Sequence, residues 1–252
     1  MIRLENICKQ FKKTKALAEI SVSFEKGQVI SLIGPNGSGK TTLIKTILGM
    51  VKPDSGKIFF KDREINGSYT YRNQIGYMPQ IGRFPDNLKM GQLFELLKKL
   101  REHREEDLDN ELIKQFDLFT MFEKPMRTLS GGTRQKVSAA VSFMFDPEVL
   151  ILDEPTAGLD PLSSEILKEK IKKEKEKKKL ILITSHILSD LDELTTHVMY
   201  MQEGRMQFLK EVELLREETG EIKLSKAIAS IMKGYDPAGS VIQEVFTAKN
   251  IK

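Results

Sequence analysis

Buried strands and amphipathic helices alternate along most of the chain, as the order of its hydrophobic and polar positions predicts. Residues 18–24 alternate apolar and polar side chains, which is typical of a strand with one buried face. Residues 41–48 place leucine and isoleucine on one helical face, and Gly49 and Pro53 follow as stop signals. Three further runs are largely apolar, as expected of parallel strands buried on both faces: residues 28–33, 149–152 and 180–184. This alternation predicts an α/β fold whose mainly parallel sheet is covered by helices on both faces.

Helical spacing replaces this pattern between about residues 86 and 146, where we expect a helical subdomain inserted into the α/β unit. Its apolar residues recur every three or four positions: Leu93, Phe94, Leu97, Leu100, then Leu108, Leu112, Ile113 and Phe116. The signal weakens after Gly204, so we divide the chain into a main unit, residues 1–210, and a short extension, residues 211–252. In the extension an amphipathic stripe predicts a helix that packs on the main unit or on a second subunit: Leu224, Ala227, Ile228, Ile231 and Met232.

A lysine-rich run lies between two of the predicted elements. Residues 168–179 contain eight lysines and three glutamates. Glu169 and Lys173 are four residues apart, and so are Glu174 and Lys178, so the run predicts a solvated helix face with ion pairs along it. Contact with an anionic lipid or a nucleic acid is the alternative interpretation.

Composition narrows the class of protein without naming a function. The 252 residues include 40 basic and 36 acidic ones, and a net charge of +4 is too small to indicate nucleic-acid binding by itself. A single cysteine, Cys8, excludes an internal disulfide and a multi-cysteine zinc site, which fits a cytosolic location. No run approaches the roughly 20 apolar residues that span a bilayer, and the N-terminal residues lack the apolar core of a signal peptide. If the protein works at a membrane, we expect another chain to hold it there.

A glycine-rich loop between a predicted strand and a predicted helix carries the first chemical signal. The loop matches G-x-x-x-x-G-K-[ST] in the strand–loop–helix context that a phosphate-binding loop requires. Small residues let successive amides surround a phosphate at the positive end of a helix dipole. The lysine supplies a point charge for the β- and γ-phosphates, and the threonine after it can ligate Mg²⁺. The predicted nucleotide-binding residues are Gly34, Pro35, Asn36, Gly37, Ser38, Gly39, Lys40, Thr41 and Thr42.

Two acidic residues end the apolar run at 149–152. Asp153 is a hard oxygen ligand, suited to contact Mg²⁺ through its water shell. Glu154 is placed to orient and polarise a water that attacks a phosphate. His186 follows the next apolar strand and is a candidate for contact with the γ-phosphate, and the side-chain carbonyl of Gln80 can reach the metal or the water. These residues predict a magnesium-dependent nucleoside triphosphatase.

A segment around residue 130 restricts the family further. Leu129-Ser-Gly-Gly-Thr133 precedes a helical stripe, and by itself Ser130 would be an ordinary helix N-cap. Together with the phosphate loop, Gln80, Asp153–Glu154, the loop ending at Asp160 and His186, it makes the first 210 or so residues resemble the ABC ATPase family, with the family's motifs in order. The resemblance implies a P-loop NTPase fold with an antiparallel β subdomain at the N-terminus and a helical signature subdomain. It also implies that ATP and Mg²⁺ are bound, that Phe11 stacks on adenine, and that Asp160 contributes to nucleotide binding.

The resemblance also implies a partner subunit. In this family two cassettes pair head to tail, and each signature segment contacts the ATP held by the other chain. Ser130 with the amides of Gly131 and Gly132 at a helix start would form that second anion site. Two half-sites that face different ways can enclose one ATP only across a two-fold axis, so we expect a homodimer. Thr133 stands where glutamine is commonest and Phe11 where tyrosine is usual, which bears on rate and nucleotide selectivity.

The use made of the ATP is read from the same resemblance. A short cassette without membrane spans is similar to ATPases that drive a separate permease, which would hold the protein on the inner face of the cell membrane. The runs 76–85 and 128–137 look most like the ATPase of the Nos transporters that serve copper-site maturation of nitrous-oxide reductase; Cys8 and three scattered histidines predict no copper ligands in this chain. An ATPase of another multidrug or ABC-2-type exporter is an alternative. A soluble family member acting in translation or DNA repair is a further alternative, less favoured because the chain has one phosphate loop and no long heptad insertion.

Overall fold

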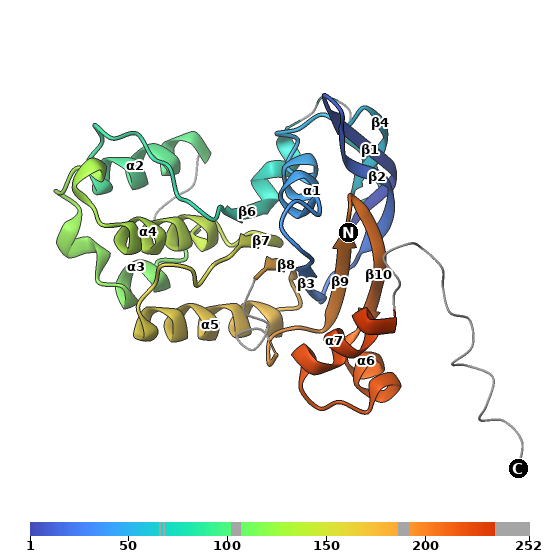
Figure 1. Cartoon of the computed structure of the whole chain (residues 1–252). Helices are drawn as coiled ribbons and strands as arrows, with labels where there is room; N and C mark the ends of the chain where they lie inside the picture. Colours follow the sequence, from blue (N-terminus) through green and yellow to red (C-terminus); the bar gives the residue numbers. More distant parts are fainter. Residues whose placement is uncertain (66, 68, 102–106, 186–191, 235–252) are drawn as a thin grey trace, which may run out of the picture.

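The computed structural model describes residues 1–65, 67, 69–101, 107–185 and 192–234 (Figure 1). Its strands are β1 Ile2–Phe11, β2 Thr14–Phe24, β3 Val29–Ile33, β4 Ser55–Phe60, β5 Arg63–Glu64, β6 Ile75–Met78, β7 Val149–Asp153, β8 Leu180–Thr184, β9 His197–Gln202 and β10 Arg205–Glu211. Its α-helices are α1 Lys40–Ile47, α2 Met90–Arg101, α3 Glu111–Gln115, α4 Gly131–Phe143, α5 Pro161–Glu176, α6 Val212–Thr219 and α7 Leu224–Gly234. Short 3₁₀ turns are η1 Thr70–Gln74, η3 Leu118–Met121 and η4 Met126–Thr128. None of these helices is long and apolar enough to cross a membrane.

The central sheet confirms the predicted parallel core. Within the described residues its strand order is β10-β9-β3-β8-β7-β6, with β10 antiparallel and the other pairs parallel. Alternate residues along β7 and β8 enter different hydrophobic clusters, because successive strand side chains point to opposite faces. On one face Leu150 and Ile181 pack with α5, and on the other Ile151 and Leu182 pack with α1. Burial on both faces explains why these strands read as continuous apolar runs.

A second, antiparallel sheet covers the α1 side of the molecule. Its strand order is β2-β1-β4-β5, and the inward residues of β1 and β2 join the cluster that contains α1. Figure 1 shows this sheet beside α1, at the opposite end from α2, α3 and α4. The predicted antiparallel β subdomain at the N-terminus is confirmed, and it flanks the loop between β3 and α1.

The helices α2, α3 and α4 lie in sequence between β6 and β7 and gather on one side of the molecule (Figure 1). Helix α2 is described as far as Arg101 and the next helix is α3, with residues 102–106 outside the described part of the chain. Helix α4 approaches β6 very closely, because a Cβ added at Gly76 would lie only 2.0 Å from the carbonyl oxygen of Ser142. The strand that leads toward Gln80 is therefore in backbone contact with the helix that starts after Ser130.

The extension packs on its own chain. Leu224, Ala227 and Ile228 of α7 are buried against Tyr200 of β9 and Phe208 of β10 in a third hydrophobic cluster. The sequence predicts that this stripe packs on the main unit or on a second subunit, and the structure shows it packed on the main unit. Residues 235–252 lie outside the described part of the chain.

The lysine-rich run is not the uniformly solvated face that its spacing predicts. Lys170 is only 2% exposed and Glu174 only 1%. The spacing predicts the pairs Glu169–Lys173 and Glu174–Lys178, but Glu169 contacts Lys172, and Glu174 contacts Lys170, Lys177 and Lys179. Lys170 instead pairs with Asp109, with Glu111 at 2.9 Å and with Glu174 at 3.0 Å. Asp109 and Glu111 lie about sixty residues earlier in the chain, and spacing within the helix cannot reveal these two partners.

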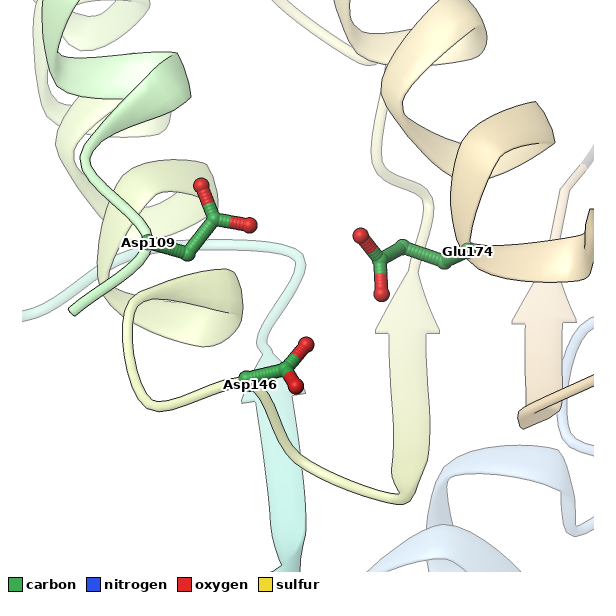
Figure 2. A group of neighbouring side chains, drawn as sticks. All are labelled: Asp109, Asp146 and Glu174. Atoms are coloured by element: carbon green, nitrogen blue, oxygen red, sulfur yellow. The ribbon is translucent and has the colours of Figure 1, made fainter. Parts of the chain in front are cut away.

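Three carboxylates of this cluster point toward one another from three separate segments of the chain, as Figure 2 shows for Asp109, Asp146 and Glu174. Lys179 bridges two of them, contacting Asp146 and Glu174 at 2.5 Å each. With Lys170 also present, the acidic charges are already matched by ammonium groups. The cluster therefore ties the helical region to α5 and to Lys179, just before β8, as a partly buried ion-pair network whose charges are compensated without a metal.

Candidate functional site

The glycine-rich loop is shaped by glycines that no other residue can replace easily. Gly34 follows the buried strand β3 with φ 147°, and a Cβ there would lie 2.1 Å from the carbonyl oxygen of Met201. Gly39 caps α1 with φ 104°, and a Cβ there would lie 2.4 Å from the carbonyl oxygen of Ala16. Gly37 has φ 79°, and a Cβ there would meet no described atom within 4 Å, so the rim of the loop is open. The loop is clamped at its base and accessible at its tip.

The start of α1 supplies the loop's donors. The first amide bonded within the helix is that of Leu43, which donates to the carbonyl oxygen of Gly39 at 2.8 Å. The amides of Lys40, Thr41 and Thr42 precede it at the open N-terminus, where the helix dipole favours an anion. The Lys40 ammonium donates to the carbonyl oxygens of Gly34 and Pro35 at 2.7 and 3.0 Å. Its charge therefore lies over the loop.

The two acidic residues lie at the carboxyl end of β7. Asp153 is 6% exposed and accepts a hydrogen bond from the Thr184 hydroxyl of β8. Glu154 has φ 51°, a left-handed conformation that is uncommon for a residue with a side chain. Its amide donates to the Thr184 carbonyl at 3.1 Å and contacts the Thr184 hydroxyl at 3.0 Å. A sharp turn thus replaces the regular strand between the two carboxylates.

Lys40 of the loop lies close enough to Asp153 and Glu154 for their charges to affect its pKa. Burial lowers the pKa of Lys40, and the nearby carboxylates of Glu154 and Asp153 act in the opposite direction. Burial raises the pKa of Asp153; the Thr184 hydrogen bond opposes this shift and the Glu154 charge adds to it. Burial, with the Asp153 charge close by, raises the pKa of Tyr77 to about 12, so this phenol stays neutral. A cation and two carboxylates therefore share one partly buried site at the sheet edge.

The segment around residue 130 forms a separate helix start. Ser130 caps α4, and its hydroxyl oxygen accepts from the amide of Thr133 at 3.2 Å. A Cβ at Gly131 would meet no described atom within 4 Å, and one at Gly132 would lie 2.9 Å from the carbonyl oxygen of Gly158. Figure 1 shows α4, the helix that Ser130 caps, in the helical group set apart from α1.

Asp160 is held within its own chain. Its carboxylate caps α5 by accepting from the Ser163 amide at 2.9 Å, and it pairs with Lys136 of α4 at 2.9 Å. The hydrogen bond from Lys136, with those from Ser163, lowers the pKa of Asp160 well below its usual range. The sequence predicts a nucleotide contact for Asp160; the structure gives it these cap and ion-pair contacts, and Lys136 is the partner that sequence reasoning missed.

Of the other predicted site residues, Phe11 and Gln80 have exposed side chains, and His186 lies outside the described part of the chain. Phe11 ends β1 and is 48% exposed, with the Lys9 ammonium 5.4 Å from its ring centroid. Gln80 is exposed and follows β6 by two residues. His186 falls in 186–191, outside the described residues. The residue that sequence reasoning overlooked is Thr184, whose polar side chain ends an otherwise apolar strand.

This combination of a clamped phosphate loop, a parallel sheet and two carboxylates at the end of β7 defines a P-loop nucleoside-triphosphatase fold. The family model described as ABC transporter matches residues 17–157. The ABC transporter ATP-binding protein YtrB of Bacillus subtilis is 30% identical over 226 residues, 89% of this chain and 77% of that protein. The lantibiotic transport ATP-binding protein SrtF of Streptococcus pyogenes is 32% identical over 211 residues, 84% of this chain and 91% of that protein.

A solved structure agrees in shape. The ATP-binding subunit of an ABC transporter superposes with a TM-score of 0.85 at 25% identity, covering 92% of this chain and 99% of that one. The chain therefore belongs to the ABC transporter family, as an ATP-binding cassette with ATPase activity.

Proposed function

We propose that the chain is the ATPase subunit of an exporter, working as a head-to-tail homodimer beneath a separate membrane permease. One observation carries this proposal: the Asp153 and Glu154 charges act on Lys40 of the phosphate loop within the chain, whereas Ser130 caps α4, which lies in the helical group set apart from α1. Both are anion sites by virtue of their helix dipoles, and each is half of a nucleotide site. A two-fold pairing brings the Ser130 half of one chain to the loop of the other.

Within the loop half-site, the residues divide the work of hydrolysis. The amides at the start of α1 and the Lys40 ammonium bind the phosphates. Glu154 orients the attacking water and accepts its proton, and direct in-line attack on the γ-phosphate needs no covalent enzyme intermediate. Ser130 with the amides of Gly131 and Gly132 of the second chain completes the phosphate contacts. His186 is proposed for the γ-phosphate, and Phe11 for stacking on the adenine.

The donor set around Lys40 fits Mg²⁺. Thr41, Gln80 and Asp153 offer only hard oxygen atoms, and the buried Asp153 carboxylate has no lysine paired to it within hydrogen-bonding distance in the described residues. A bound Mg²⁺ supplies charge that offsets the phosphate oxygens. Asp160, fixed by Ser163 and Lys136, is proposed to hold the loop after β7 in shape where it faces the second chain's nucleotide.

A cleft of about 200 Å³ offers a place for the permease. It lies where the end of α1 meets β6, α2 and α4, and its mixture of apolar side chains and two arginines fits a short permease helix with apolar and acidic residues. The lining residues that carry this argument are Leu48, Met50, Arg72, Tyr77, Leu97 and Arg101. We expect Met50→Glu to reduce co-purification of the membrane partner. Phe119→Glu is the matched control, because Phe119 is similarly exposed but lies outside the cleft.

The cargo is proposed at the level of class. Similarity to a lantibiotic transport ATPase supports export, and the resemblance of residues 76–85 and 128–137 to Nos-type ATPases supports a role in copper-site maturation of nitrous-oxide reductase. Loss of the copper sites of that enzyme, and not of its polypeptide, on deletion of this chain would support the second role. Unchanged copper content would rule it out and leave the exporter role standing.

The dimer is tested by separating binding from hydrolysis. We expect Glu154→Gln to bind ATP and accumulate as a dimer in size-exclusion chromatography with light scattering, because the closed pair cannot reopen without hydrolysis. Adding Ser130→Arg to that variant places a bulky cation in the second half-site, and the dimer should be lost while each monomer still binds ATP. A dimer that persists in the double variant would overturn the head-to-tail arrangement.

A further inference from the structure

Thr184 ends β8 at the point where that strand faces the two acids of β7. It is the register partner of Asp153 in the parallel pairing of the two strands. The four preceding residues of β8 are leucine or isoleucine, and Thr184 is itself only 2% exposed. A hydroxyl in that position must find partners within the protein, because water does not reach it.

The hydroxyl finds both kinds of partner at once. It donates its hydrogen to Asp153 Oδ1, and one of its lone pairs accepts from the Glu154 amide at 3.0 Å. A threonine hydroxyl offers one donor and two acceptor sites, so these two contacts use the donor and one acceptor. One side chain thereby touches the carboxylate of the first acid and the backbone of the second.

The second contact bears on a strained residue. In a continuing strand the side chains of Asp153 and Glu154 would point to opposite faces of the sheet. The left-handed conformation of Glu154 breaks that alternation, and both carboxylates act on the charge of Lys40. Such a conformation persists only where surrounding contacts hold it. Here the Glu154 amide is held by the hydroxyl and carbonyl of Thr184, and the Glu154 carbonyl accepts from the Ala157 amide at 3.1 Å.

We infer that Thr184 is a positioning residue of the hydrolytic site, which uses one hydroxyl to fix the direction of the Asp153 carboxylate and the backbone turn that aims Glu154. The inference rests on the roles proposed above for these two acids and adds a third residue on which both depend. Thr184 engages Oδ1 of Asp153, so this hydrogen bond does not occupy the second carboxylate oxygen. A serine can make the same two contacts, whereas the isosteric valine can make neither.

The test compares Thr184→Val with Thr184→Ser. We expect Thr184→Val to lower kcat for ATP by about 10- to 100-fold with little change in KM, which is the usual weight of a hydrogen bond to a charged group. Thr184→Ser should restore kcat to within about threefold of the wild type. A second readout avoids turnover: Mn²⁺ binding in the presence of ADP, followed by electron paramagnetic resonance of the free ion. The valine variant should bind Mn²⁺ more weakly by a similar factor.

Thr195→Val is the matched control. Thr195 is also a buried threonine, and its hydroxyl lies 2.6 Å from that of Ser31 on β3. We expect it to lower the unfolding temperature without changing kcat per folded molecule or Mn²⁺ affinity. A Thr184→Val protein that matches the wild type in both measurements would overturn the inference. If instead the wild type does not hydrolyse ATP, or Glu154→Gln hydrolyses it normally, the proposed function itself fails.

Discussion

Two buried acids, Asp153 at the end of β7 and Glu174 on α5, experience opposite electrostatic environments. Burial raises the pKa of Asp153. Among the described residues, the one side chain that hydrogen-bonds to its carboxylate is the neutral hydroxyl of Thr184. Burial by itself also raises the pKa of Glu174, but hydrogen bonds from Lys179, Lys170 and Lys177 outweigh it and lower that pKa. The two residues differ in what surrounds them, since both are almost fully buried.

The difference indicates that Glu174 has a structural role, whereas Asp153 is suited to bind a ligand. Glu174 is matched by three ammonium groups, so it gains nothing from a cation and serves to join the helical region to α5 and to Lys179, just before β8. Asp153 keeps a charge that the described residues do not neutralise by direct pairing, which is what a metal-binding acid requires. The protein therefore tolerates the free-energy cost of a buried, unpaired carboxylate at one edge of the sheet.

The largest expected effect is on hydrolysis. Glu154→Gln should slow ATP turnover by roughly 10²–10⁴-fold, the typical share of a positioned base, with the unfolding temperature nearly unchanged. Glu174→Gln should show the reverse: lower stability, and near-normal turnover per folded molecule at low temperature. Steady-state hydrolysis and thermal unfolding of both variants check this. A Glu174→Gln protein that is folded but inactive would break the distinction between the two acids.

A large effect on stability is expected from the network around Glu174. Lys170→Met removes the central ammonium and leaves Asp109, Glu111 and Glu174 without it, which should cost about 3–5 kcal/mol in the free energy of unfolding. Lys173→Met, on the exposed side of the same helix, should cost no more than about 1 kcal/mol. Urea unfolding monitored by circular dichroism measures both. Equal losses would show that burial of the pair is unimportant.

A smaller effect concerns pH. Because the folded pKa of Glu174 is lower than its unfolded value of about 4.3, its ion pairs stabilise the protein above that value and are lost as pH falls through the folded pKa. The wild type should therefore lose stability below about pH 4.3 more steeply than Glu174→Gln. Urea unfolding at a series of acidic pH values tests the slope. Parallel curves would show that folding does not shift the pKa of Glu174.

The smallest expected effect is a gain in stability, on substitution of Asp153. Since burial raises the pKa of Asp153, its ionised form is disfavoured by folding, and Asp153→Asn removes that cost while still accepting from Thr184. In buffer with EDTA and no nucleotide, the variant should unfold at a higher temperature, by about 2–4 °C for each kcal/mol regained. Differential scanning calorimetry measures the change. A lower unfolding temperature would place Asp153 in the same category as Glu174.

The local patterns foresee most of what depends on neighbours in sequence. Continuous apolar runs identify β3, β7 and β8, because strands buried on both faces leave that trace. The glycine pattern identifies the loop before α1, because only glycine tolerates the left-handed conformations and close approaches found there.

What escapes prediction depends on residues far apart in the chain. Lys170 meets Asp109 and Glu111 across about sixty residues, and spacing within the helix suggests a solvated surface instead. Thr184 faces Asp153 across 31 residues, and that pairing follows from the strand register alone. A threonine that ends an apolar strand beside an acid-bearing strand is the signal that would have found it.

The tight contact between Gly76 and Ser142 leaves no slack between β6 and α4. Because the two backbones are in direct contact, a tilt of α4 would also displace β6, the strand that leads to Gln80. Any side chain at position 76 would push β6 and α4 apart, so this coupling between strand and helix requires glycine at that position.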